Sequence, residues 1–272
     1  MPDPIILITG STDGIGKATA IELVSRGAEV ILHGRTPAKG VRVRREIKDR
    51  TGTTPDLVIA DYTEQDQIRK MAAEISSRYT RLDVLVNDAG TYERTRKVTA
   101  NGVEKTLAVN FLGPFLLTNL LLPLVRNSAP SRIVTVASSA HEDVDLIDWD
   151  DLRTGARYDP WARYSLSKFG DIVFTYALAR RAAGSGVTAN CLHPGVVDTR
   201  LLRTSFPGYQ GITPEEGAKT SVYLATSPEV AGVSGLYFDR CKPVRSTDMT
   251  YDRDIQERFW EIAGQLTGIP GN

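Results

Sequence analysis

The sequence begins with a short apolar run that leads directly into a glycine-rich turn. Residues 4–9 are almost continuously apolar, as expected for a strand that is buried on both faces. Three glycines follow at positions 10, 14 and 16, and the apolar residues after them recur at helical spacing. A strand, a glycine turn and a helix in this order are typical of a dinucleotide-binding unit. The chain is therefore predicted to form an α/β fold with a doubly wound, mostly parallel sheet.

Each glycine of this turn has an expected role. Gly10 permits the tight turn, Gly14 leaves room for a pyrophosphate near the backbone, and Gly16 lets the helix pack closely on the strand. The helix N-terminus offers free N–H groups and a partial positive charge to the phosphates. A glycine-rich turn without a ligand is the alternative interpretation. The predicted cofactor contacts of the turn are Gly10, Ser11, Thr12, Asp13, Gly14, Ile15 and Gly16.

The end of the second predicted strand, residues 29–33, bears on the choice between NAD and NADP. An acidic residue there would bind the ribose 2′-hydroxyl of NAD, whereas an arginine accommodates the 2′-phosphate of NADP. This chain has Gly34-Arg35 and no acidic residue until Glu46. Because an arginine can bind a phosphate through two charge-assisted hydrogen bonds, we predict NADP, with NAD less favoured. The alternative is that Arg35 is a solvated loop residue.

Tyr164 and Lys168 lie four residues apart in a segment that is predicted to be helical. Residues at this spacing share one helix face, so the phenol and the ammonium would be neighbours. A nearby cation favours the phenolate, which makes the phenol a candidate general acid/base for alcohol or carbonyl chemistry. By itself the pair is weak evidence, because a tyrosine and a lysine often share the surface of a helix.

Together, the glycine turn and the Tyr-x-x-x-Lys pair resemble the short-chain dehydrogenase/reductase family, classical type. Further family motifs follow in the right order: Asp61, Asn87-Asp88-Ala89-Gly90, Asn110, Ser138-Ser139, and Pro194-Gly195 with Thr199. Within the family, segments such as His33-Gly34-Arg35 and Ser138-Ser139-Ala140-His141 resemble the retinol dehydrogenase and WW-domain oxidoreductase-like group. There are two departures from the pattern. Asp88 replaces an asparagine and adds a negative charge near the site, and Phe169-Gly170-Asp171 follows Lys168 where the group often has smaller or amide residues.

The resemblance implies a single Rossmann-fold domain and hydride transfer between a nicotinamide and a carbonyl or alcohol carbon. Tyr164 would be the general acid/base, Lys168 would hold the nicotinamide ribose, and Asn110 would support Lys168 through a water relay. Ser139 would hydrogen-bond the substrate oxygen, while the Ser138 hydroxyl would satisfy backbone groups. The predicted catalytic residues are therefore Asn110, Ser139, Tyr164 and Lys168. The remaining predicted cofactor contacts are Arg35, Asp61, Tyr62, Asn87, Ala89, Gly90, Tyr164, Lys168, Pro194, Gly195, Val197 and Thr199.

Two segments are expected to form the substrate side. Residues 140–163 lie between Ser139 and Tyr164 as an insertion with several apolar side chains. Residues 196–215 are predicted to be a mobile lid, because glycines flank them and could act as hinges. The candidate substrate contacts are Ser139, His141, Trp161, Leu201, Leu202 and Phe206. They indicate an apolar substrate of medium size; ordinary packing of the insertion is the alternative.

The composition fits one domain over residues 1–272, with a seven-stranded sheet and a C-terminal extension from about residue 240. The chain has 272 residues, of which 41% are hydrophobic, and neither a linker nor a repeat divides it. Its 33 basic and 33 acidic residues balance, so the charge gives no sign of nucleic-acid binding. No cluster of His, Cys and Asp has metal-ligand spacing, so no metal is predicted.

The same features suggest a cytoplasmic protein with reduced cysteines. No signal segment is recognisable, and no stretch approaches the roughly 18 apolar residues that span a bilayer. Residues 111–125 are predicted to be a buried helix, and Cys191 lies in an apolar strand. The amphipathic segment 252–263 could pack on its own domain, face another subunit or touch a membrane surface. The resemblance implies a homodimer or homotetramer.

Two functions other than an oxidoreductase are compatible with a dinucleotide-binding fold. A catalytically silent dinucleotide-binding redox sensor or scaffold is the main alternative, but the retained Ser139, Tyr164 and Lys168 favour an enzyme. A nucleotide-sugar epimerase or dehydratase would have a larger C-terminal domain than the segment after Gly195 allows. Because fold alone does not decide function, the proton-transfer residues carry this prediction.

Overall fold

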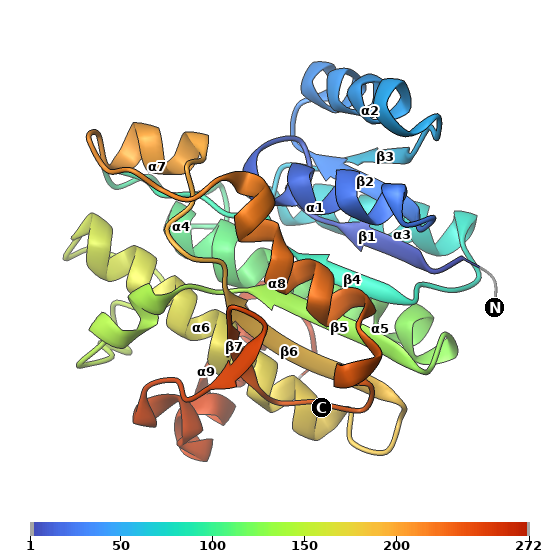
Figure 1. The fold of residues 1–272 in the computed structure, drawn as a ribbon. Helices are drawn as coiled ribbons and strands as arrows, with labels where there is room; N and C mark the ends of the chain where they lie inside the picture. The colour runs from blue at the N-terminus through green and yellow to red at the C-terminus, as the bar shows by residue number, and fades with distance from the viewer. Residues whose placement is uncertain (1–2, 271–272) are drawn as a thin grey trace.

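In the computed structural model, which describes residues 3–270, helices cover both faces of one central sheet (Figure 1). The sheet has eight strands in the order β3-β2-β1-β4-β5-β6-β7-β8. The strands are β1 (Ile5–Ile8), β2 (Glu29–Gly34), β3 (Asp56–Ile59), β4 (Val84–Asn87), β5 (Ser131–Val136), β6 (Val187–His193), β7 (Tyr237–Asp239) and β8 (Lys242–Val244). The first seven are parallel, and the strand order reverses at β1, which lies between β2 and β4. The predicted doubly wound Rossmann-type fold is confirmed.

The helices alternate with these strands along the chain. They are α1 (Gly14–Ser25), α2 (Pro37–Thr51), α3 (Gln65–Arg78), α4 (Lys105–Leu107), α5 (Gly113–Asn127), α6 (Pro160–Arg181), α7 (Arg200–Ser205), α8 (Pro214–Thr226) and α9 (Arg253–Thr267). A π-helical segment η1 (Ala108–Leu112) joins α4 to α5, and short 3-10 helices are η2 (Ser139–Asp143), η3 (Pro228–Val230) and η4 (Asp248–Tyr251).

The sheet divides the hydrophobic core into two layers. In β1, Ile5 and Leu7 pack with α3, α5 and α6, whereas Ile6 and Ile8 pack with α1, α2 and α8. Successive side chains of a strand point to opposite faces of the sheet, and helices cover both faces here. All four side chains of β1 are therefore buried. This two-sided burial explains why the strand is continuously apolar.

The strand count of seven was wrong because β8 adds an antiparallel edge strand to the sheet. Residues 240 and 241 form the two-residue loop between β7 and β8, and both have positive φ, at 47° and 61°. Such a hairpin turn normally carries Asn-Gly or Asp-Gly. Here it carries Arg240-Cys241, so the usual sequence signal for a hairpin is missing.

The C-terminal helix α9 packs on its own domain, which confirms one of the three alternatives for this segment. Phe259 and Trp260 are buried against the aromatic rings of α5, α6 and η1. The carboxylate of Asp252 caps the helix by accepting hydrogen bonds from the N–H groups of Asp254 and Ile255. The apolar face of α9 is therefore covered by the helix that also carries Tyr164.

Residues Lys105–Asn127 form a 23-residue helical run that is long and apolar enough to cross a membrane. The expectation that no such stretch exists was wrong, because Gly113, Pro114 and Pro123 do not interrupt the run. However, 72% of its most apolar window is buried inside the structure. The prediction of a buried core helix over residues 111–125 is confirmed.

Candidate active site

The turns that follow β1 and β4 pack against each other where the strand order reverses. The Thr9 hydroxyl accepts hydrogen bonds from the N–H groups of Asp88 and Ala89, at 2.9 and 3.0 Å. Gly10 has φ +70°, and a Cβ on it would lie 2.8 Å from the Cα atom of Ala89. A Cβ on Gly16 would lie 2.5 Å from the Asp88 carboxylate. Two glycines of the turn are therefore required by close backbone packing at the place where such sheets bind ligands.

The glycine turn also presents free hydrogen-bond donors, as a pyrophosphate site requires. The N–H groups of Thr12 and Ile15 donate no hydrogen bond to any group within residues 3–270. The Asp13 side chain caps α1 by accepting from the Gly14 N–H at 2.8 Å. Free N–H groups at a helix N-terminus bind anions, so this turn fits the phosphates of a dinucleotide.

Arg35 follows β2 beside the glycine turn. The preceding Gly34 lies so close to the Thr12 side chain that a Cβ would overlap it. Arg35 is exposed and forms no ion pair with the described residues, which leaves its guanidinium available to a phosphate. Lys17, another cation of this region, is instead paired with Glu46 at 3.2 Å.

His33 connects the glycine turn to β3, a role that the sequence analysis missed. Its Nδ1 accepts from the Gly10 N–H at 3.2 Å, so the ring proton is on Nε2, which lies 3.0 Å from the Ala60 carbonyl oxygen. Burial lowers the pKa of His33 to about 4, which keeps the ring neutral near pH 7. The resemblance to other chains at His33-Gly34-Arg35 is the only sequence signal for this connection.

The cofactor residues predicted after β3 differ in their exposure. The Asp61 carboxylate accepts hydrogen bonds from both the N–H and the hydroxyl of Thr63, which forms a local turn after β3. Tyr62 is buried, with its ring stacked on His33 at 4.9 Å between centroids and in contact with Gly113. The Tyr62 side chain therefore lies in the core, and a cofactor could meet only its backbone.

Asn87 and Asn110 hold the backbone around the loop that follows β4. Asn87 is buried at the end of β4, and its side-chain amide donates to the Thr118 hydroxyl at 3.0 Å. The Asn110 amide lies in the π-helical segment, donates to the Thr91 carbonyl and the Ser167 hydroxyl, and accepts from the Thr91 N–H. Asn110 therefore links this loop to α6, in the kind of helix distortion that is frequent at functional sites.

Tyr164 and Lys168 are neighbours on α6, as their spacing predicts. The Lys168 Nζ lies 6.0 Å from the centre of the Tyr164 ring. The ammonium donates to the Val136 carbonyl at 2.8 Å and to the Asp171 carboxylate at 2.9 Å. A Cβ on Gly90 would lie 3.6 Å from the Asn110 Oδ1 and 4.0 Å from the Lys168 Nζ, so Asn110 and Lys168 both face Gly90.

The two serines after β5 have different surroundings. The Ser138 hydroxyl accepts from the Ala140 N–H at 3.2 Å and so serves the backbone. Ser139 is exposed at the start of η2, and its own N–H donates to His193 Nδ1 at 3.1 Å. This arrangement leaves the Ser139 hydroxyl free to meet a substrate oxygen.

His141 does not lie on the substrate side, so its prediction as a substrate contact was wrong. It is fully buried, and its ring nitrogens lie 2.7 Å from the Ser138 carbonyl oxygen and 3.2 Å from the Thr247 N–H. Its ring also packs edge-on against Tyr237. His141 thus holds the backbone behind the serines, and burial lowers its pKa.

Two aromatic rings flank Tyr164, and a third packs on both of them. We call these four residues the aromatic cluster (Tyr92, Trp161, Tyr164 and Phe206). The Tyr164 ring centre lies 5.5 Å from that of Tyr92 and 6.0 Å from that of Trp161. Phe206 lies 4.8 Å from Tyr92 and 5.8 Å from Trp161. These rings place apolar surface beside the half-buried Tyr164 side chain.

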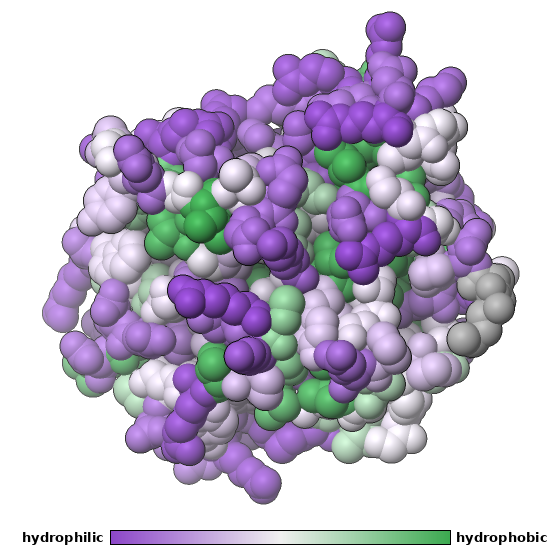
Figure 2. Space-filling model, viewed as in Figure 1, coloured by the Kyte–Doolittle hydropathy of each residue, from purple (hydrophilic) through white to green (hydrophobic). Residues whose placement is uncertain are grey.

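Phe206 belongs to the predicted lid, which contains the short helix α7. The base of this segment is closed by reciprocal hydrogen bonds between residues 196–198 and Ile212, each 2.8 Å long. Thr199 caps α7 and lies against Gly14 of the glycine turn. Leu202 and Val197 are buried, so Val197 faces the protein interior. Figure 2 shows a small apolar patch on this side of the molecule, and Val196, Tyr209 and Ile212 are exposed apolar residues of the lid.

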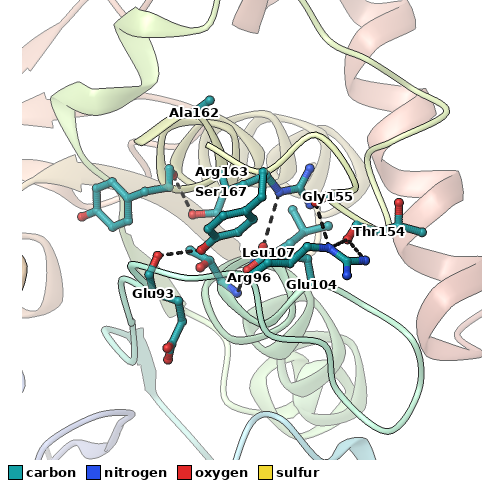
Figure 3. Close-up of polar contacts among 12 residues, drawn as sticks. Glu93, Arg96, Glu104, Leu107, Thr154, Gly155, Ala162, Arg163 and Ser167 are labelled. Carbon is teal, nitrogen blue, oxygen red and sulfur yellow. Dashed lines mark hydrogen bonds and ion pairs between the residues drawn. The ribbon is translucent and has the colours of Figure 1, made fainter. Parts of the chain in front are cut away.

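A buried ion pair fastens the insertion beside Tyr164 (Figure 3). The Glu104 carboxylate caps α4 by accepting from two N–H groups and lies 3.4 Å from the Arg163 Nε. The Arg163 guanidinium also donates to the Leu152 carbonyl at 2.6 Å, and Arg96 donates to the carbonyls of Thr154 and Gly155. Sequence reasoning missed this network, because its members are distant along the chain.

A glycine turn of the dinucleotide-binding kind at the sheet reversal is typical of nucleotide-dependent oxidoreductases. The family model described as short chain dehydrogenase matches residues 4–210, and the chain belongs to that family. Within it, the chain is of the retinol dehydrogenase group. Human retinol dehydrogenase 14 is 39% identical over 97% of this chain and 86% of its own length. Human polyprenol dehydrogenase is 36% identical over 98% of this chain and 86% of its own length.

Solved structures share the fold over nearly the whole chain. An uncharacterised protein of Mycobacterium paratuberculosis has a TM-score of 0.81 and 30% identity, covering 98% of this chain and 96% of its own. A short-chain dehydrogenase of Shigella flexneri, solved as a complex with NADP, has a TM-score of 0.74 and 26% identity, covering 89% of this chain and 98% of its own. The protein is accordingly an oxidoreductase that acts on alcohol or carbonyl groups. Within residues 3–270, no group of three or more His, Cys, Asp and Glu side chains is placed to hold a metal ion.

Proposed function

We propose that the protein is an NADP(H)-dependent oxidoreductase for apolar carbonyl or alcohol substrates of medium size, with Tyr164 as the general acid/base. The observation that carries this proposal is the surrounding of the Tyr164 phenol. The Tyr92 and Trp161 rings lie 5.5 and 6.0 Å from the Tyr164 ring centre, and Phe206 packs on both of them. The Lys168 ammonium lies 6.0 Å from the same ring centre. An acid/base group and an apolar binding surface therefore coincide.

In the reductive direction, the bound nicotinamide supplies a hydride to the carbonyl carbon. Tyr164 donates its proton to the carbonyl oxygen at the same step, and solvent later returns that proton to the phenolate. Ser139 donates a hydrogen bond to the oxygen on which negative charge develops. Lys168 has three donors, of which Val136 and Asp171 use two, so one is left for the cofactor ribose. Support of Lys168 by Asn110 through a water relay is part of this proposal.

The preference for an apolar substrate rests on the aromatic cluster and on the lid. Aromatic rings bind apolar surface strongly, and ring-to-ring contacts add to that effect. The two human relatives are named for the oxidation of retinol and polyprenol, which are apolar alcohols. A clear preference for a small, highly charged substrate would overturn this part of the proposal.

The preference for NADP rests on Arg35, which is exposed beside the glycine turn and free of ion pairs within residues 3–270. The NADP complex of the Shigella flexneri relative supports it. Replacing Arg35 with alanine should raise the KM for NADPH about 10- to 100-fold, since a charge-assisted hydrogen bond contributes about 1.5–3 kcal/mol. The KM for NADH should change little. Equal effects on both cofactors would argue against a role in 2′-phosphate binding.

The decisive experiment measures NADPH oxidation with a panel of apolar aldehydes and ketones. The wild type and the Tyr164→Phe variant are compared side by side. The variant should bind NADPH normally and lose at least about 100-fold in kcat, because general acid catalysis contributes that much or more. Near-normal turnover in the variant would refute the role of Tyr164. NADPH binding without turnover of any substrate would instead favour the silent sensor. A homo-oligomer and a cytoplasmic location also belong to this proposal, and sedimentation and cell fractionation test them.

A further inference from the structure

Lys168 is paired with a buried carboxylate on its own helix. Asp171 follows it by three residues on α6, and its Oδ2 accepts a hydrogen bond from the Lys168 Nζ at 2.9 Å. The two side chains are only 7% and 1% exposed. The second carboxylate oxygen, Oδ1, has no hydrogen-bond partner within residues 3–270. The negative charge of Asp171 is therefore directed at the ammonium with little screening by solvent.

The remaining charged groups around this pair are few. Asp88, in the loop after β4, is a second carboxylate whose charge favours the protonated form of Lys168. Cys191 on β6 lies near Asp171, and burial raises the pKa of its thiol, so the thiol is neutral. On α6 itself, Tyr164 is the other titratable neighbour of Lys168. Asp171 is thus the acidic group in direct contact with the ammonium.

We propose that Asp171 is a positioning residue that fixes Lys168 and partly cancels its charge, and that it thereby sets how strongly the ammonium acts on the Tyr164 phenol. This inference rests on the proposed function of Tyr164 as the acid/base. An ammonium favours the phenolate of a neighbouring phenol, and a carboxylate paired with that ammonium weakens the effect. Removing the carboxylate should favour proton loss from the pair, whichever of the two groups releases the proton.

The test compares the wild type with Asp171→Asn and Asp171→Ala. The asparagine keeps the size of the side chain and an acceptor oxygen, and the alanine serves as a second variant if the buried amide impairs folding. Two quantities are measured against pH: kcat for alcohol oxidation with NADP⁺, and the tyrosinate absorbance difference between each protein and its Tyr164→Phe counterpart. We expect the pH midpoint of kcat and the pH midpoint of the tyrosinate absorbance each to fall by about one unit in the Asp171 variants. One unit below the wild-type midpoint, oxidation should then be about fivefold faster.

Glu104→Gln provides a matched control, because it also removes a buried carboxylate that is paired with a cation of α6, here Arg163. It should lower the melting temperature without moving either midpoint. Midpoints of both Asp171 variants within about 0.3 units of the wild type would overturn the inference.

The two proposals can fail separately. Shifted tyrosinate midpoints without turnover of any substrate would remove the proposed function and keep the role of Asp171. Normal turnover with unchanged midpoints would keep the proposed function and remove the role of Asp171.

Discussion

Truncating Phe259 to alanine tests whether α9 supports the helix that carries Tyr164. Phe259 is 0% exposed, and its ring centre lies 5.6 Å from those of Phe111 and Phe169 and 5.4 Å from that of Trp149. Burying about 150–200 Å² of apolar surface at about 25 cal/mol per Å² contributes about 4–5 kcal/mol. Measured truncations of buried phenylalanine cost about 3–5 kcal/mol. We therefore expect a loss of about 4 kcal/mol in the free energy of unfolding.

Urea unfolding followed by tryptophan fluorescence measures this loss, and the melting temperature should fall by about 8 °C. Leu146→Ala is the matched control, because Leu146 is 85% exposed and its truncation should cost less than about 0.5 kcal/mol. The kcat of Phe259→Ala should also fall, since Phe111 and Phe169 adjoin Asn110 and Lys168 in the chain. A loss below about 1.5 kcal/mol would refute the packing of α9 on its own domain.

Three further predictions concern the cleft. Gly16→Ala should abolish NADPH binding, measured by fluorescence, because the new methyl would lie 2.5 Å from the Asp88 carboxylate and 2.9 Å from the Gly10 carbonyl; near-normal affinity would contradict this. Burial raises the pKa of Asp88 to about 7, above its unfolded value of about 3.9, so the wild type should lose stability as pH rises from about 4 to 7. In urea unfolding, the free energy of unfolding of Asp88→Asn should therefore increase relative to that of the wild type between pH 5 and 8. A constant difference would be evidence against a raised pKa of Asp88. Phe206→Ala should raise the KM for an apolar aldehyde about tenfold with a smaller change in kcat, because it removes an aromatic contact of the cluster; an unchanged KM would separate Phe206 from the substrate.

Local patterns in the sequence were sufficient for much of the site. The apolar run at residues 4–9 predicted β1 because a strand buried on both faces has few polar positions. The spacing of Tyr164 and Lys168 predicted their contact because helix geometry alone brings residues four apart together. In both cases the structure depends on residues that are close along the chain.

Side chains whose direction depends on distant residues were not predictable in this way. His141 follows the two serines, but its ring is held by the Thr247 backbone, 106 residues further along the chain. Tyr62 follows Asp61, but it turns into the core because Gly113 leaves space for its ring. Their positions in the sequence predicted that both residues lie near the substrate or the cofactor. The directions of their side chains depend instead on packing against distant parts of the chain.

The charge around Lys168 shows why a motif does not determine acid–base behaviour. Residues 165–178 of α6 are buried without interruption, so the helix has no solvated face to which a charge could turn. A buried ammonium requires a partner, and Asp171 is placed to be one by its helical spacing. The sequence showed Asp88 and Asp171 only as part of departures from a family pattern; in the structure the Asp171 carboxylate contacts the ammonium, and the charge of Asp88 acts on it in the same direction. Under the proposed roles, the Tyr-x-x-x-Lys motif supplies the reacting groups, and the carboxylates around Lys168 set the pH range in which these groups react.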